Sequence, residues 1–392
     1  MPTYRTVLRS RELRAVLGAH VCSMLAMIVG DVALTILVYQ RTSSALLSAM
    51  TFAIGFVPMG LGAVLFGGVG GDRPSRDVLV ACEAVAAALV GLMALPGMPV
   101  AAILGLLAVK GAIDPIFSGT RAATLPELVG DEGFPLARSL LRLVAQNVQL
   151  VGFAVGGVAL VFVSPGEALA GASVAYAVAA LILVAGTRRR PPPARTDGPI
   201  TPLIGLRNLF ATPGMRPIIA LTWLPGFFAV APEALANPYA TTIGGGTVAV
   251  GLLLTGLPVG SVLGELVVGA RVTPARRVRL IVPLAAAGFV PPLLFTVGPS
   301  LPVAVALLVL AGLAAYLIGL DQLALATLAE SARRQAFALL SAGMMVTQGL
   351  GFAAAGAVAE WLPVTAVIPL FALTGLLVVL VTGRTLRAPV HS

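Results

Sequence analysis

Six acidic residues and one lysine interrupt long apolar stretches of the chain. They are Asp31, Glu83, Lys110, Asp114, Glu233, Glu265 and Asp321. A charge at bilayer depth costs at least about 2.5–3.5 kcal/mol, so each side chain is expected to face a cavity or a partner. Burial favours the neutral, protonated form of a carboxyl group. A carboxyl group in such a place is therefore a candidate for binding and releasing a proton.

Asp31 is the first candidate for this chemistry. It follows Gly30 in an apolar run, and its short side chain cannot extend to water. The alternative role is structural pairing between helices. The same alternative applies to Glu233, because the adjacent Pro232 breaks a helix and leaves backbone groups to be satisfied.

Lys110 and Asp114 are four residues apart, so they should share one face of a helix. Two interpretations of the pair are open. It is either a neutral pair that lowers the cost of insertion, or a pair that a proton or a substrate opens. Pro115 directly after it indicates a kink.

Uncharged polar residues add hydrogen-bonding capacity to the same stretches. With Lys110, the candidates for contacting a substrate are Gln146, Asn147, Gln149 and Gln348. We expect His20 to be packed in a core. We expect Glu83 and Glu265 to pair with Arg76 and Arg271 near the ends of their runs.

Several kinds of chemistry have no motif in the sequence. We find no phosphate-binding loop for ATP, no nucleophile–base set and no cluster of metal ligands. Cys22 and Cys82 lie in separate apolar runs, where we expect neither a disulfide nor a metal site. The sequence therefore predicts neither an enzyme nor a protein with a cofactor.

The composition places the apolar stretches in a membrane. The chain has 392 residues, of which 58% are hydrophobic and 10% are charged, and its mean hydropathy is +1.01. A soluble domain has about 25% charged residues. We predict an all-α membrane protein, in contact with lipids, whose twelve helices are each about 20 residues long. The expected helices are 14–39, 45–70, 77–95, 100–122, 136–162, 167–186, 216–240, 247–270, 278–297, 301–328, 335–359 and 364–383.

The net charge of +9 is a topology signal and does not indicate nucleic-acid binding. Lys110 is the only lysine, and 23 of the 24 arginines fall on one side of the predicted helices, with Arg41 on the other. This asymmetry predicts that both termini are cytoplasmic. The polar linker 187–215 separates an N-terminal six-helix half, 1–186, from a C-terminal half, 216–392.

The two halves show signs of a repeat. Gln149-Leu150-Val151-Gly152-Phe153 recurs as Gln348-Gly349-Leu350-Gly351-Phe352, at an offset of 199 residues. The charged loop Gly67–Asp77 has a basic counterpart, Gly269–Arg277, at about the same offset. The agreement of the two offsets with the linker position favours an internal duplication.

The loop between the second and third predicted helices resembles that of major facilitator superfamily transporters. The pattern of that family reads roughly G-x-x-x-D-R-x-G-R-R. Its matching residues here are Gly68, Asp72, Arg73 and Arg76. Ser75 stands where the family has glycine, and Asp77 where it usually has a second basic residue. The resemblance implies that this loop governs the conformational equilibrium.

Other segments resemble the bacterial drug- and siderophore-exporter branch, of the actinobacterial type. They include Arg121–Val129 and Pro232–Tyr239. A further segment resembles the antiporter motif G-P-x-x-G-G through Gly152, Gly156 and Gly157, with Phe153 in place of the proline. Close packing of small residues between helices is an equal alternative for these glycines.

The resemblance implies a twelve-helix secondary transporter of the inner or plasma membrane, a monomer working by alternating access. Helices 1, 4, 7 and 10 line the central cavity in the family. Here each carries one acidic residue, so the proton-coupling candidates are Asp31, Asp114, Glu233 and Asp321. The expected activity is proton-coupled efflux of a small amphiphilic compound. The alternatives are an uptake permease on the same fold, a sensor or lipid-binding protein without transport, and, more distantly, an intramembrane enzyme.

Overall fold

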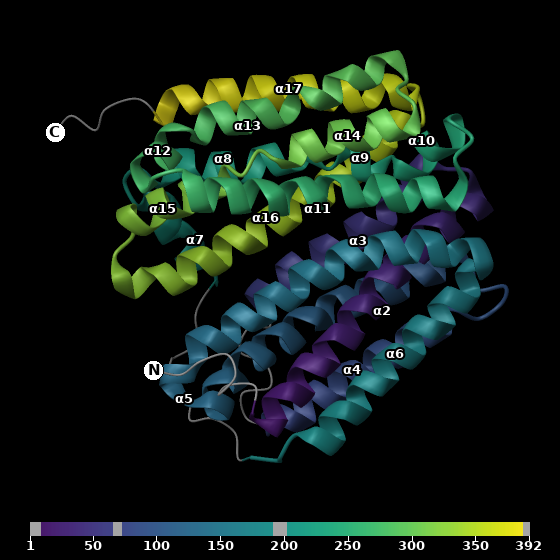
Figure 1. The fold of residues 1–392 in the computed structure, drawn as a ribbon, viewed down its shortest axis with the longest axis vertical. Coiled ribbons are helices and arrows are strands. Elements are labelled where there is room, and N and C mark those ends of the chain that lie inside the picture. Colours follow the sequence, from purple (N-terminus) through teal and green to yellow (C-terminus); the bar gives the residue numbers. More distant parts are fainter. Residues whose placement is uncertain (1–8, 66–72, 191–201, 387–392) are drawn as a thin grey trace. The chain divides into compact units, whose positions relative to one another are not determined.

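The computed structural model describes residues 9–65, 73–190 and 202–386, and all regular secondary structure in these ranges is helical (Figure 1). The chain packs as two units. One comprises Met1–Leu37 and Leu61–Pro199, and the other Val38–Gly60 and Ile200–Ser392. Each unit has its own apolar core. The predicted division into two six-helix halves stays a prediction.

The first unit is built mainly from α2 (Arg11–Thr42), α4 (Ser75–Met93), α5 (Val100–Phe162) and α6 (Pro165–Gly186). The start of α6 is encoded locally by a capping box. The Ser164 hydroxyl accepts from the Glu167 N–H, and the Glu167 carboxylate accepts from the Ser164 N–H. Further along, the Ser173 hydroxyl of α6 donates to the carbonyl of Ala87 on α4, at 2.7 Å.

The first arm of α5 runs antiparallel to α2. Arg121 is hydrogen-bonded to His20, near the beginning of α2. Lys110, eleven residues earlier on α5, interacts electrostatically with Asp31, eleven residues later on α2. The sequence order on the two helices is therefore opposite.

The second arm of α5 runs parallel to α2. Ala137 lies in one apolar cluster with Leu13, and Gly152 lies against Ile28. Since the two arms follow α2 in opposite directions, α5 must turn back on itself, although its residues are helical throughout. This reversal agrees with the two helices predicted at 100–122 and 136–162.

The second unit contains the first part of α3, all helices from α7 onward and one 3-10 helix. Their bounds are α3 (Ala45–Leu65), α7 (Pro202–Ala211), α8 (Met215–Ala229), α9 (Ala231–Ala234), α10 (Ala236–Thr242), α11 (Gly246–Arg271), α12 (Pro274–Arg279), α13 (Ile281–Phe289), η1 (Pro291–Val297), α14 (Leu301–Gly312), α15 (Leu317–Thr327), α16 (Glu330–Ala359) and α17 (Val364–Leu386). The Phe52 ring of α3 stacks on Phe352 of α16, with centroids 4.9 Å apart.

Three predicted helices of this unit are broken. The segment 216–240 becomes α8, α9 and α10 around Pro232, and α13 passes into the 3-10 turn η1 at Pro291. A third break separates α14 from α15 after Gly312. Proline lacks an N–H and cannot continue the helical hydrogen-bond ladder, which accounts for the first two breaks. Discontinuous helices are a feature of transporter folds.

Glycine allows α11 and α14 to touch backbone to backbone. A Cβ atom added at Gly264 would lie 2.5 Å from the carbonyl oxygen of Leu313, and one at Gly256 would lie 2.8 Å from the Leu308 Cβ. No larger residue fits these positions without a shift. Small residues at helix contacts are the usual packing device inside membranes.

Nine segments of the described residues are long and apolar enough to cross a membrane. The three other predicted spans are helical, but α4 carries Arg76, Asp77 and Glu83, and Asn147–Phe162 and Ile281–Val297 are shorter. The all-α membrane fold is thus confirmed, and the number twelve stays a prediction. The short helix α7, inside the predicted linker, was not foreseen.

Candidate functional site

Four ionisable side chains form a cluster inside the first unit. Lys110 and Asp114 of α5 make an ion pair with Nζ 2.9 Å from Oδ2, as their spacing predicts. The Lys110 ammonium lies 5.5 Å from the ring centre of Tyr176 on α6. Asp31 of α2, which is half-buried, interacts electrostatically with both Lys110 and Asp114.

The cluster contains one base and two carboxyl groups, so its charge depends on a proton. With both carboxyls ionised it carries one net negative charge, which is costly in a low-dielectric interior. One bound proton makes it neutral. Asp114 accepts a hydrogen bond from Lys110, whereas Asp31 interacts with Lys110 only electrostatically. The carboxylate form of Asp31 is therefore the less stabilised of the two. Asp31 is therefore the member of the cluster at which proton binding is expected.

Tyr176 is a member of this cluster that the sequence did not identify. It is 4% exposed, and its ring faces the Lys110 ammonium. An ammonium near an aromatic face is stabilised by the ring quadrupole. In the sequence, Tyr176 is visible only as a phenol in the middle of the alanine-rich helix α6. That its ring lies against Lys110 depends on how α6 packs on α5, which only the fold shows.

A second polar group joins α2, α4 and α5 within the same unit. The Ser23 hydroxyl is hydrogen-bonded to the Glu83 carboxyl group, and Arg121 is hydrogen-bonded to His20. The predicted pairing of Glu83 with Arg76 is wrong. Glu83 lies almost two helical turns further along α4 and faces α2 instead.

The loop resembling the family pattern is described only from Arg73 onward, and Gly68 and Asp72 lie outside the described residues. Arg73 is exposed. Arg76 donates through Nη2 to the carbonyl oxygen of Val184 on α6, at 2.7 Å, and its buried Nε has no partner among the described residues. Arg76 thereby ties the start of α4 to the end of α6.

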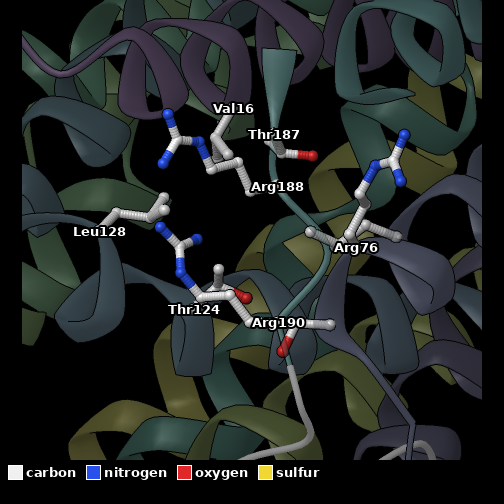
Figure 2. A pocket seen from close by; sticks show the side chains of 9 residues that line it. Val16, Arg76, Thr124, Leu128, Thr187, Arg188 and Arg190 are labelled. Carbon is white, nitrogen blue, oxygen red and sulfur yellow. The ribbon is translucent and has the colours of Figure 1, made fainter. Parts of the chain in front are cut away.

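Arg76 also lines a small basic pocket (Figure 2). Arg188 and Arg190 contribute two further guanidinium groups, and Val16 and Leu128 form an apolar side. The free volume is about 10 Å³, which is close to the room that one water needs. The pocket is too tight for a transported molecule. It lies at the start of α4, beside the loop that the family resemblance predicts to govern the conformational equilibrium.

The candidates in the second unit lie on separate helices. Glu233 is half-buried on the single turn α9, next to Pro232, and makes no ion pair with a described residue. Asp321 and Glu265 are exposed on α15 and α11. Gln348 of α16 lies against Gly226 of α8.

The remaining candidates lie on the second arm of α5. They are Gln146, Asn147 and Gln149, which lie within one helical turn, and the side chains of Asn147 and Gln149 are exposed.

The glycines that resemble the antiporter motif lie at a helix contact. A Cβ atom at Gly152 would lie 3.0 Å from the Ile28 side chain, and Gly156 faces Val29 of α2. Gly157 is buried too. The contact supports the packing role, and a role in antiport stays a prediction.

Comparisons with known proteins bear on the fold. No family model matches the sequence, and no curated protein matches it either. Solved structures do match over nearly the whole chain. A point mutant of the nucleoside transporter NupG superposes with a TM-score of 0.73 at 14% identity, covering 94% of this chain and 99% of its own.

Two further structures show the same similarity. A POT family transporter in complex with a thioalcohol-conjugated peptide gives a TM-score of 0.75 at 11% identity, covering 96% of this chain and 97% of its own. A bacterial homolog of the human lysosomal transporter Spinster, inward-facing and unoccupied, gives 0.65 at 14% identity, with 96% of each chain covered. The protein therefore has the major facilitator fold and is a multi-pass membrane protein. The exporter branch is not confirmed by these neighbours.

Proposed function

We propose that the protein is a secondary transporter that exports a small amphiphilic compound in exchange for protons. The observation that carries the proposal is the Asp31–Lys110–Asp114–Tyr176 cluster, inside apolar helices of a fold shared with nucleoside and peptide transporters. An intramembrane charge is retained where it serves an ion pathway or a substrate. The similar solved structures are described as transporters, not as enzymes.

Proton binding at Asp31 neutralises the cluster, and proton release restores its negative charge. Alternating access uses this difference if the two charge states favour different conformations. One charge moving down the membrane potential supplies about 2.3 kcal/mol per 100 mV, which corresponds to about fiftyfold accumulation. Lys110 stabilises the unprotonated state by holding the second carboxylate, Asp114.

In this proposal the protein is a monomer of the inner or plasma membrane, with both termini in the cytoplasm. The arginine asymmetry supports this orientation. The two six-helix halves, 1–186 and 216–392, would be the moving parts, joined by the linker 187–215. Reporter fusions within that linker and after Ser392 should both give cytoplasmic signals. An external signal from either one would contradict this orientation.

The second candidate function is uptake of a metabolite on the same fold. It is suggested by the metabolite-like compounds of the similar structures, which are a nucleoside transporter and two POT family transporters in complex with a peptide derivative and with 5-aminolevulinic acid. A thermal-shift screen should therefore test nucleosides, dipeptides and 5-aminolevulinic acid beside antibiotics, siderophores and dyes. A third interpretation, a sensor or lipid-binding protein, predicts binding without flux.

The decisive experiment uses the compound that the screen identifies, in vesicles with an imposed proton gradient. Asp31→Asn, which imitates the protonated residue, should abolish gradient-driven accumulation and preserve downhill exchange. Glu167→Gln is the matched control, because Glu167 is an exposed carboxylate at the start of α6. It should accumulate the compound as the wild type does. Wild-type accumulation in Asp31→Asn would remove Asp31 from the mechanism.

A further inference from the structure

Glu83 is a buried carboxyl group that the proposed exchange cycle does not use. It lies on α4, is 2% exposed, and its Oε2 atom has no hydrogen-bond partner among the described residues. Its Oε1 atom is hydrogen-bonded to the Ser23 hydroxyl. A buried carboxylate with one free oxygen is far more costly than a buried neutral acid with one free carbonyl oxygen.

The proton count at Ser23 favours the neutral acid. The Ser23 oxygen lies within hydrogen-bond distance of both Glu83 Oε1 and the Ala19 carbonyl, the latter at 2.8 Å. A serine hydroxyl has one proton to donate, and the carbonyl of Ala19 can only accept. Both contacts are satisfied at once if Ser23 donates to Ala19 and a protonated Glu83 donates to Ser23.

Arg121 is the cation that could take the place of the Glu83 proton. It lies near enough to Glu83 to interact electrostatically, but it is hydrogen-bonded to the Nδ1 atom of His20. An arginine only donates, so Nδ1 accepts and His20 is the neutral tautomer with its proton on Nε2. The Arg121 guanidinium is therefore hydrogen-bonded to the neutral His20 ring, although the Glu83 carboxyl group lies close enough to interact with it.

Among the residues that the structure describes, seven ionisable groups surround Glu83. They are His20 and Cys22 from α2, Lys110, Asp114 and Arg121 from α5, Cys82 on α4 itself, and Tyr176 from α6, which faces Lys110. Glu83 interacts electrostatically with Lys110 and Asp114 as well as with Arg121. It therefore connects the Asp31 cluster to the His20–Arg121 pair.

These groups are spread along the axis of α2. His20 and Asp31 are eleven residues apart, which is about 16 Å along a helix and about half of a hydrocarbon core of about 30 Å. The His20 end is the end that carries the arginine-rich, predicted cytoplasmic segments. The polar groups thus extend from the level of Asp31 towards that side.

We propose that Glu83 is a second proton-binding site, protonated in this conformation, which loses its proton to water on the cytoplasmic side when Arg121 leaves His20 and pairs with the carboxylate. In this step the carboxyl O–H bond breaks, water accepts the proton, and Arg121 donates to the oxygen that is freed. The inference deepens the proposed proton-driven transport, and its direction of release rests on that function. Proton binding itself does not require a transported compound.

Infrared difference spectra between low and high pH test the site directly. The full-length protein is held in phosphatidylcholine vesicles without any added compound, and the carbonyl stretch of protonated carboxylic acids is followed. The wild type should lose a band as the pH rises, and Glu83→Gln should lack that band. Asp31→Asn should retain it, which separates Glu83 from the first site.

Two further variants identify the band by its surroundings. Ser23→Ala should change its frequency, because the carboxyl group loses its hydrogen-bond acceptor. Arg121→Gln should make the band persist to higher pH, because the carboxylate loses its cation. These shifts assign the band to Glu83 even if Glu83→Gln folds poorly.

Three results would overturn the proposal. No Glu83-dependent band at any pH would mean that the residue is always ionised, and a band unchanged at every pH would mean that it never releases its proton. An unchanged band in Arg121→Gln would remove Arg121 from the step. If the wild type binds protons at Glu83 but shows no proton-driven flux, the transport proposal fails and the proton site stands.

Discussion

At the residue scale, the ion pair of Lys110 and Asp114 gives the sharpest test of the first cluster. Lys110→Met leaves the Asp114 carboxylate and Asp31 without a base. Breaking a buried pair costs about 3–5 kcal/mol. Here the loss of folding free energy should be about 3 kcal/mol or less, because the Asp114 side chain is 28% exposed.

The double variant Lys110→Met/Asp114→Asn removes the unpaired charge with its partner. It should unfold at a higher temperature than Lys110→Met alone, in thermal melts of the detergent-solubilised protein. Asp114→Asn alone completes the double-mutant cycle. Additive effects of the two single changes would mean that the pair contributes nothing as a pair.

Glu360 gives a residue-scale prediction about pH. It accepts hydrogen bonds from the N–H of Leu46, at 2.9 Å, and from the Ser44 hydroxyl, at 2.7 Å. These bonds, of which the one from Leu46 has the larger effect, hold the pKa of Glu360 below its ordinary value. A carboxyl whose pKa is lower in the folded state stabilises that state above its unfolded pKa, and the gain is lost as the pH falls through the lowered value.

Glu360→Gln should therefore lower the melting temperature at neutral pH, and the difference from the wild type should shrink as the pH falls below about 4.3. Ser44→Ala, which removes one of the two donors, should show a smaller difference with the same trend. The measurement is a series of melts between neutral and acidic pH. A gap between wild type and Glu360→Gln that widens in acid would contradict the role of the carboxylate.

At the element scale, the close contact of α11 with α14 predicts unequal costs for two glycines of one helix. Gly264→Ala would place its Cβ 2.5 Å from the Leu313 carbonyl oxygen, whereas a Cβ at Gly269 meets nothing within 4 Å. Overpacking of this kind costs about 1–3 kcal/mol. Gly269→Ala should be neutral or slightly stabilising, since alanine is the better helix former by up to about 1 kcal/mol. Equal melting temperatures for the two variants would disprove the contact.

The elements show what could be predicted from the sequence and what could not. Apolar run length located most of the helices, and Pro232 marked one break in advance, whereas the breaks at Pro291 and after Gly312 were not predicted. The spacing of Lys110 and Asp114 alone predicted their pair, because both lie on one helix. Tyr176 was missed and Glu83 was given the wrong partner, because those contacts depend on which faces of separate helices meet.

At the scale of the whole molecule, the similar solved structures answer the question of the fold, and the charged residues of this chain bear on the question of mechanism. The solved structures establish the major facilitator fold at 11–14% identity, a level at which only the fold is transferable. The proposed exchange of protons rests instead on the charged cluster of this chain. The identity of the substrate depends on the shape of the binding site and not on a local sequence motif. The thermal-shift screen is therefore the experiment that identifies it.

The loop before α4 provides the last prediction, which concerns the conformational cycle of the whole molecule. Arg76 bonds to the Val184 carbonyl at the end of α6, while Arg73, three residues earlier, is exposed. Asp72, outside the described residues, belongs to the same family-like pattern. A contact that links helix ends should change the balance of conformations without touching the transported compound.

Arg76→Ala and Asp72→Ala should each lower the rate of exchange in vesicles severalfold and leave equilibrium binding of the identified compound within about twofold. Arg384→Ala is the matched control, because Arg384 is an exposed arginine in the last turn of α17 and lies outside this loop. It should exchange at close to the wild-type rate. The rates come from tracer exchange at saturating compound, and binding comes from calorimetry on the same preparations. Loss of binding in Arg76→Ala with an unchanged exchange rate per bound molecule would place the loop in substrate recognition and not in gating.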